Sequence, residues 1–258
     1  MKSKAAAGFT LLELATVLVI LGIILGGVML GRSLLTSSHL QSVIADVDNI
    51  TSAVSNFKQA YQSLPGDDPN ATANWGTASN GCPDGGGTGT CNGNGDGEIG
   101  TVTGYEYESY RFWQHLYDAG VLQYNLKGFS VGGTYGSVLN FNVPAGSVPG
   151  SGFFVWWIGM RSSGGGSNLF PGFYGNAIQF GSTRSGVDVV NYPILTPDQA
   201  GAVDTKMDDG LPATGKVRTY ISSASYGLNC TTSDDPSTAV YNVTYTSVAC
   251  PLIFVMGF

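Results

Sequence analysis

The first candidate for chemistry in this 258-residue chain is a carboxylate in an unusual place. Glu13 is the only ionisable side chain in residues 5–31. A carboxylate inside a bilayer costs at least about 2.5–3.5 kcal/mol, so a group of this kind usually has a partner and a function. No lysine or arginine lies between Lys4 and Arg32 to neutralise it. A cation that neutralises Glu13 must therefore come from outside this stretch of side chains.

Cleavage of the chain after Gly8 would create the missing cation. The new α-amino group would lie on Phe9, one helical turn before Glu13. In a packed assembly of low dielectric, that amine and the carboxylate of a neighbouring copy could neutralise each other. We therefore expect cleavage between Gly8 and Phe9, and we assign Glu13 to assembly and to axial register.

An apolar stretch at residues 9–31 must position this carboxylate. As a helix it would rise about 34 Å, enough to cross a hydrocarbon core of about 30 Å. Lys2 and Lys4 precede it and predict that the short leader stays cytoplasmic. A secretory signal peptide is an alternative, but the apolar run is too long for one and no A-x-A-like site follows it. A plain single-span anchor explains the length but not Glu13.

The sequence GFTLLEL at residues 8–14 resembles the prepilin cleavage motif of bacterial type IV pilins and type II secretion pseudopilins. The resemblance implies that a prepilin peptidase cuts after Gly8 and that Phe9 becomes the methylated N-terminus. It implies that Glu13, fifth in the mature chain, acts in assembly. It also implies that the apolar helix holds the subunit in the inner membrane before packing in a filament core. The motif covers residues 1–31 only.

The following segment predicts that the same helix continues with one apolar face. Apolar residues are spaced alternately by three and four, and no proline occurs before Pro65. One helix is therefore expected from about Thr10 to Ser63, apolar all round in its first half and amphipathic in its second. A coiled-coil stalk is the alternative, but the long sequence that follows favours a globular head. The expected seam comprises Leu40, Val43, Val47, Ile50, Val54, Phe57, Tyr61 and Leu64.

Four parts of the chain follow from these patterns. They are a cleaved leader at residues 1–8, a membrane and filament-core half-helix at 9–31, an amphipathic half-helix at 32–64, and a head at 65–258. A Gly- and Asn-rich loop at residues 66–104 opens the head.

Short elements are predicted in the rest of the head. Helices are expected at residues 108–122 and from Pro197 to about Met207, the second with Thr196 and Gln199 as a capping box. The fold class is α+β: a long N-terminal helix, its hydrophobic half protruding, packed on a mostly antiparallel sheet as in type IV pilins. Apolar runs predict strands at residues 138–143, 153–160 (a central strand), 177–180, 187–195, 217–222, 239–248 and 252–256.

Four cysteines in the head allow three pairings. We favour Cys82 with Cys91 and Cys230 with Cys250, because each pair joins local partners and disulfides persist in exported chains. A C-terminal segment bounded by a disulfide is also a feature of many type IV pilins. Zinc is disfavoured because the spacing of Cys82 and Cys91 exceeds that of common zinc sites and no histidine is near.

Oxygen-bearing side chains alternate in the loop and predict a calcium site. Asn92, Asn94, Asp96 and Glu98 resemble the start of a calcium loop, with glycine in the sixth position. The match is partial, because the twelfth position is Thr103 instead of glutamate. A second acidic cluster at residues 204–210 has Lys206 where a ligand would be needed. The alternative is an Asx-rich turn that satisfies its own backbone. No other cofactor is expected.

Composition narrows the function classes. The chain has 18 acidic and 11 basic residues, so it is a poor candidate for binding a phosphate backbone, and we expect no nucleic-acid partner. Its 43% hydrophobic residues argue against disorder. The sequence contains no GxSxG, HExxH, P-loop or CxxC motif. The adjacent pair Asp67 and Asp68 is typical of exposed turns, where carboxylates are solvated rather than catalytic. Because the known catalytic motifs are also missing from the sequence, we expect no enzymatic activity.

The resemblance predicts a structural subunit of an extracellular type IV pilus-like filament, serving adhesion, motility, DNA uptake or secretion. Its expected partners are identical subunits, prepilin peptidase, the inner membrane and the pilus assembly machinery. Its expected location is the bacterial inner membrane and then the cell surface. A minor pilin or a pseudopilin of a type II secretion system, periplasmic in the latter case, is an alternative. An alternative of another class is a membrane-tethered module that binds a surface glycan or DNA.

Overall fold

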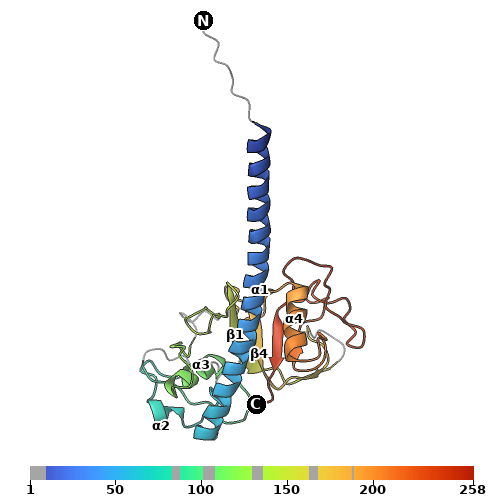
Figure 1. Ribbon diagram of the computed structural model, residues 1–258. Helices are drawn as coiled ribbons and strands as arrows, with labels where there is room; N and C mark the ends of the chain where they lie inside the picture. Colours follow the sequence, from blue (N-terminus) through green and yellow to red (C-terminus); the bar gives the residue numbers. More distant parts are fainter. Residues whose placement is uncertain (1–9, 83–87, 101–107, 130–135, 163–167, 188) are drawn as a thin grey trace. The chain divides into compact units, whose positions relative to one another are not determined.

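The computed structural model describes residues 10–82, 88–100, 108–129, 136–162, 168–187 and 189–258, without the side chains of residues 29, 30, 32 and 33. The chain divides into two compact units, residues 1–39 and 40–258. One continuous helix, α1 (Leu11–Tyr61), contributes to both units (Figure 1). Its ends lie within two residues of those expected.

In the first unit, α1 is apolar on every side. All side chains from Leu11 to Val28 are exposed within the chain, Leu11 by 88% and Ile23 by 71%. A helix that is hydrophobic all round belongs in a protein core or in a membrane. This part of α1 therefore requires lipid or other helices around it.

In the second unit, α1 buries one face. The predicted seam is confirmed from Leu40 to Phe57, and Leu64 is also buried, whereas Tyr61 is half-buried. The helix ends because Gln62 adopts φ +54°, a left-handed conformation, and Pro65 follows. A proline lacks the N–H that a further helical turn would need.

The seam packs on one face of a four-stranded antiparallel sheet with the order β1-β4-β6-β5. Register places Phe153 opposite Phe180 and Ile178 opposite Phe254, all four on the face that contacts α1. The α+β class is thereby confirmed (Figure 1). The strands are β1 (Ser151–Trp157), β4 (Asn176–Ser182), β5 (Val217–Arg218) and β6 (Leu252–Val255), and a separate hairpin pairs β2 (Met160–Arg161) with β3 (Gly172–Phe173).

Three short helices complete the second unit. They are α2 (Ala71–Trp75), α3 (Glu108–Asp118) and α4 (Pro197–Met207). The predicted capping box is confirmed: Gln199 N–H donates to Thr196 Oγ1 at 3.3 Å, and Thr196 N–H donates to Gln199 Oε1 at 3.0 Å. The helix expected to reach residue 122 stops earlier, because Gly120 adopts φ +71°.

Several predicted strands are wrong or shorter. The described parts of 138–143, 187–195 and 239–248 form turns and isolated bridges. In the first, Asn140 adopts φ +60° and Asn142 Oδ1 accepts the Val138 N–H at 2.7 Å, which closes a tight turn. The strand expected at 217–222 ends at Arg218, and the one expected at 153–160 ends at Trp157. That strand, β1, lies at the sheet edge rather than at its centre.

Candidate processing and assembly site

The first turn of α1 holds the candidate assembly residue. Glu13 Oε2 accepts hydrogen bonds from the backbone N–H and the hydroxyl of Thr10, each at 2.8 Å, and the Glu13 N–H donates to Thr10 Oγ1 at 3.3 Å. These reciprocal bonds form a capping box, in which each residue satisfies a backbone donor of the other. The negative charge also interacts favourably with the positive end of the helix dipole. The pattern Thr-x-x-Glu at residues 10–13 is the sequence signal for this cap, which is an intramolecular role of Glu13 beside the intermolecular one predicted above.

The capping box leaves part of the carboxylate available. Only Oε2 accepts these bonds, and Oε1 accepts none from the residues that the structure describes. Glu13 and its neighbours Leu12 and Leu14 are exposed within the chain, the leucines by 75% and 55%. A carboxylate oriented by its own helix, with one open oxygen, can accept a bond from an amine on another copy. Gly8 and Phe9 lie outside the described residues, so cleavage and methylation there stay predictions.

The apolar segment meets the length and composition needed to cross a membrane. The 18 residues Leu11–Val28 have a mean hydropathy of 2.5, and none of this window is buried. In the described chain, α1 is the one helix that passes this test. Glu13 lies near the N-terminal end of the window, as the sequence predicted.

Two buried carboxylates, which the sequence analysis missed, organise the Gly- and Asn-rich loop. Asp67 accepts the N–H groups of Gly95 at 2.6 Å and Gly97 at 2.8 Å, and Glu108 accepts those of Asn94 at 3.1 Å and Gly100 at 2.6 Å. Burial raises the pKa of Glu108 to about 7, although these two bonds favour its charged form.

The interpretation of Asp67 and Asp68 as exposed turn residues is wrong, because they are 2% and 1% exposed. Two acidic residues after Pro-Gly are compatible with a solvated turn and with a buried one, so this pattern alone does not predict their burial. The signal that could have indicated burial is the density of glycine downstream. A Cβ on Gly93 would lie 2.3 Å from the Cα of Asp67, so the loop must pass very close to this residue.

Three of the four predicted calcium ligands use their side-chain oxygens for hydrogen bonds within the loop region. Asn92 Oδ1 accepts the Thr72 N–H at 2.7 Å, Asn94 Oδ1 accepts the Asp96 N–H at 3.0 Å, and Asp96 Oδ1 accepts the Glu98 N–H at 2.8 Å. Asn94 Nδ2 also donates to Asp96 Oδ2 at 2.7 Å. Glu98 is exposed. These contacts are those of an Asx-rich turn, and calcium binding here stays a prediction.

His115 ties the start of the head to the first disulfide loop. Its Nδ1 accepts the Gly66 N–H at 2.9 Å, and its Nε2 lies 3.0 Å from Thr90 Oγ1 and 3.3 Å from the Cys91 carbonyl oxygen. The ring is fully buried and stacks on Phe57 of α1. Burial and the nearby Arg111 lower the pKa of His115 to about 3. His115 is therefore a neutral structural residue that donates from Nε2.

We expect His115→Ala to lower the free energy of unfolding by about 2–3 kcal/mol, because it leaves the buried Gly66 N–H without an acceptor. The histidine contribution is fully present above pH 6.5, its unfolded pKa, and is lost as the pH falls toward 3. Thermal unfolding by circular dichroism at pH 7 and pH 4.5 measures both effects. The matched control is His39→Ala, at a half-buried position on α1. An equal melting temperature for both variants would contradict this role.

Both favoured cysteine pairings are present. Cys82 pairs with Cys91 and Cys230 with Cys250, and their Cα atoms are 5.8 and 5.1 Å apart. The second disulfide lies in the core beside the seam of α1. Leu195 exchanges backbone hydrogen bonds with Cys250, so this disulfide also fixes the start of α4.

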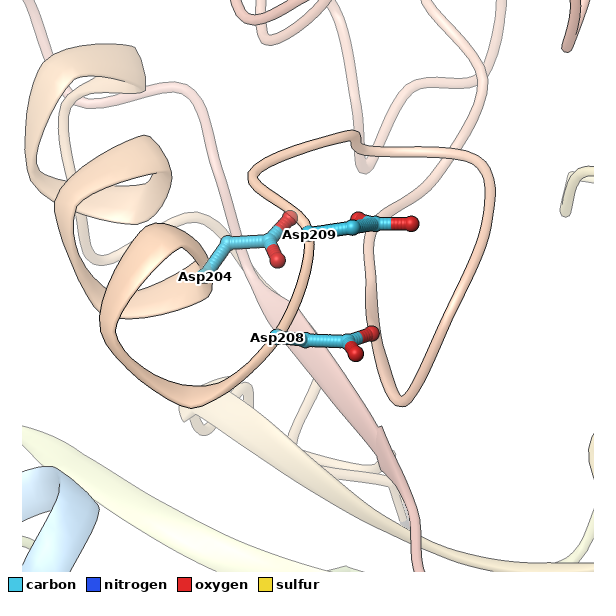
Figure 2. Close-up of side chains that lie close together, drawn as sticks. All are labelled: Asp204, Asp208 and Asp209. Atoms are coloured by element: carbon cyan, nitrogen blue, oxygen red, sulfur yellow. The ribbon is translucent and has the colours of Figure 1, made fainter.

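Three carboxylates converge at the end of α4. Oxygen atoms of Asp204, Asp208 and Asp209 all lie within 4.8 Å of one another (Figure 2). Asp204 is buried and accepts the hydroxyl of Tyr241 at 2.9 Å and the Gly210 N–H at 3.1 Å. Burial is the main cause that raises the pKa of Asp204 to about 7, and the two neighbouring aspartates add to it.

The stability of the second unit should depend on Asp204 between pH 4 and pH 8. A raised pKa means that the folded state holds a proton that the unfolded state releases, so this contribution is present below pH 3.8 and is lost as the pH rises through 7. Asp204→Asn should remove this fall in melting temperature, measured in EDTA to exclude bound cations. Asp198→Asn, at an exposed position on the same helix, is the control. An unchanged pH profile in Asp204→Asn would refute the assignment.

Comparison with protein families gives a match at the N-terminus. Residues 3–29 match the family model described as the prokaryotic N-terminal methylation motif. The match covers the predicted cleavage site, Glu13 and most of the apolar segment, and it leaves residues 40–258 unmatched. Searches of curated proteins and of solved structures found no match to the chain.

Proposed function

We propose that this chain, a prepilin of the type IV pilin or pseudopilin type, is a structural subunit of an extracellular type IV pilus-like filament. It is made in the inner membrane, cut after Gly8 by prepilin peptidase, and polymerised through α1. The observation that carries the proposal is the pairing of a matched methylation motif with an apolar helix that has no cover within its own chain. The role is structural rather than enzymatic.

Assembly of such a subunit is a transfer of α1 from lipid to a bundle of identical helices. Lipid is already apolar, so burial alone contributes little, and packing and polar contacts must stabilise the bundle. Glu13 provides the polar contact within the apolar segment. Its open Oε1 would accept the α-amine of Phe9 from a neighbouring copy, and this pairing would fix the axial register of the two helices.

A minor pilin or a pseudopilin of a type II secretion system is the second candidate. The large head favours it, because the second unit alone spans residues 40–258. A pseudopilin would remain in the periplasm, whereas a pilus subunit would reach the cell surface. A membrane-tethered module that binds surface glycans would keep its N-terminal segment and would stay monomeric.

The test is intact-mass and N-terminal analysis of fibres sheared from cells. We expect a chain that starts at Phe9 with a methylated amine, carries both disulfides, and is a main component of the fibres. A trace amount in fibres made of another subunit would assign a minor pilin. A native chain that still starts at Met1 and is never found in a polymer would refute the proposal.

Calcium binding in the loop can be tested on the same purified protein. If Asn94 and Asp96 bind Ca²⁺, EDTA will lower the melting temperature and Asp96→Asn will remove that effect. If these residues only satisfy the backbone, EDTA will leave the melting temperature unchanged. The hydrogen bonds of the loop favour the second result. Asp235→Asn is a control, because Asp235 also caps an exposed turn through Ser237.

A further inference from the structure

The two disulfides of the head differ in their access to solvent. Cys82 is exposed, whereas its partner Cys91 is buried, at 4% exposure. Cys230 and Cys250 are both 0% exposed. Thiol–disulfide exchange requires that an attacking thiolate reach one of the two sulfurs. Access therefore makes the first disulfide the more reactive of the two.

A guanidinium lies beside the buried sulfur of the first disulfide. Arg111 Nη2 donates to Cys91 Sγ at 3.1 Å, and Arg111 Nη1 donates to Gln114 Oε1 at 2.7 Å, which orients the group. Burial lowers the pKa of Arg111 to about 10, and the Asp118 carboxylate opposes that shift, so the side chain is cationic at pH 7. A cation contacts a neutral disulfide sulfur weakly and a thiolate strongly. Arg111 therefore favours the departure of Cys91 as a thiolate.

The second disulfide has a neutral neighbour instead of a cation. The hydroxyl of Thr219 lies 3.6 Å from Cys230 Sγ, and this hydroxyl donates to the Pro251 carbonyl oxygen at 2.6 Å. A hydroxyl whose hydrogen is already donated to a carbonyl oxygen cannot stabilise a departing thiolate. Access and the neighbouring group thus both favour exchange at the first disulfide.

The chain around Cys91 is held by α3 independently of the disulfide. Thr90 Oγ1 donates to Gln114 Oε1 at 2.9 Å, and Gln114 Nε2 donates to the Gly89 carbonyl oxygen at 3.0 Å. His115 Nε2 also lies 3.3 Å from the Cys91 carbonyl oxygen. These contacts would keep Cys91 in place after the S–S bond breaks. The freed thiolate would then remain positioned to close the disulfide again, which makes the exchange reversible.

We propose that Cys82 is a site of reversible modification by small thiols. The thiolate of the small thiol forms a new S–S bond with Cys82 Sγ. The bond between Cys82 and Cys91 breaks, and its electron pair leaves with Cys91 Sγ beside Arg111. One disulfide and one thiolate are present before and after the step, so it needs no oxidant or reductant. This reactivity is separate from the proposed function, because it requires no polymer.

Timed reaction of the purified full-length chain with reduced glutathione at pH 7 tests the site. The reaction is stopped with acid and alkylated with N-ethylmaleimide, which traps the freed cysteine, and peptide mass spectrometry assigns each product. We expect the first disulfide to open about tenfold faster than the second, with glutathione on Cys82 and N-ethylmaleimide on Cys91. Glutathione mainly on Cys91, or equal opening rates for the two disulfides, would overturn the proposal.

Two variants separate the charge of Arg111 from its packing. Arg111→Gln removes the cation and should slow opening of the first disulfide several-fold, whereas Arg111→Lys keeps the cation and should open nearly as fast as the wild type. Arg161→Gln is the matched control, because Arg161 is half-buried over the ring of Trp156.

A guanidinium that only packs the loop in place gives the opposite result. Arg111→Gln would then loosen the loop and open as fast as the wild type or faster, which would overturn the role of the charge. If Arg111→Gln unfolds, the second disulfide opens together with the first. The ratio of the two opening rates in the wild type and its site of glutathione attachment then decide the proposal without any variant.

Discussion

Replacement of Glu13 by valine should leave cleavage intact and abolish filaments. The change makes insertion in the membrane more favourable, because it removes a carboxylate that costs at least about 2.5–3.5 kcal/mol there. It also removes both the capping box with Thr10 and the open oxygen that would pair with a neighbouring amine. Immunoblots of sheared fibres and of membranes, compared by band size and amount, measure assembly and processing separately.

Two further variants separate the two roles of Glu13. Glu13→Gln keeps an oxygen that can accept from Thr10 but loses the charge, whereas Thr10→Ala keeps the charge and loses half of the capping box. If the charge pair sets the register, Glu13→Gln should assemble as poorly as Glu13→Val, and Thr10→Ala should retain much of its assembly. Normal filaments from Glu13→Gln would refute the charge pairing and leave helix capping as the role of the residue.

Gly8→Glu should block processing and, with it, assembly. The residue before the scissile bond would then be bulky and charged in place of glycine, and the α-amine of Phe9 would not form. We expect the full-length precursor to accumulate in the membrane with no mature band and no fibres, whereas wild-type cells show the mature band. Ala5→Glu places the same charge three residues earlier in the leader and is the matched control.

A mature-length chain from Gly8→Glu cells would contradict the assigned cleavage site. If Gly8→Glu is processed and Ala5→Glu is not, the cut lies at another position in the leader. Either result would place the new α-amine on a residue other than Phe9, and the proposed pairing with Glu13 would lose its assigned partner.

The parts of the fold that the sequence predicted are those whose physical signal is local. The α1 seam repeats every three or four residues, and its members up to Phe57 are buried as a set. Thr196, Pro197 and Gln199 carry the start of α4 in four consecutive positions, and the capping box forms as expected. Each cysteine pair closes a short loop, so the local pairings were the simplest ones and both are present.

The parts that were missed depend on contacts between distant residues. The segment at 239–248 alternates apolar and polar residues, but Tyr241 is buried against Asp204 of α4 and the chain around it turns. The burial of Glu108 depends on the loop at residues 94–100, which donates to both of its oxygens. The sequence around Glu108 does not indicate that backbone N–H groups of this loop will donate to it. The capping role of Glu13 has a local signal, Thr-x-x-Glu, but the cost of a carboxylate in a membrane favours a partner in another chain and does not indicate the cap.

The position of β6 sets a condition on the order in which this protein can mature. Leu252–Val255 lies between β4 and β5, and it follows every other element along the chain. In the proposed route, where α1 is inserted first, the sheet stays divided until these residues have followed it across the membrane. A subunit truncated by a premature stop, or stalled during export, would lack the strand that joins the two sides. If the chain is exported as proposed, a complete head therefore requires that β6 has also been translocated.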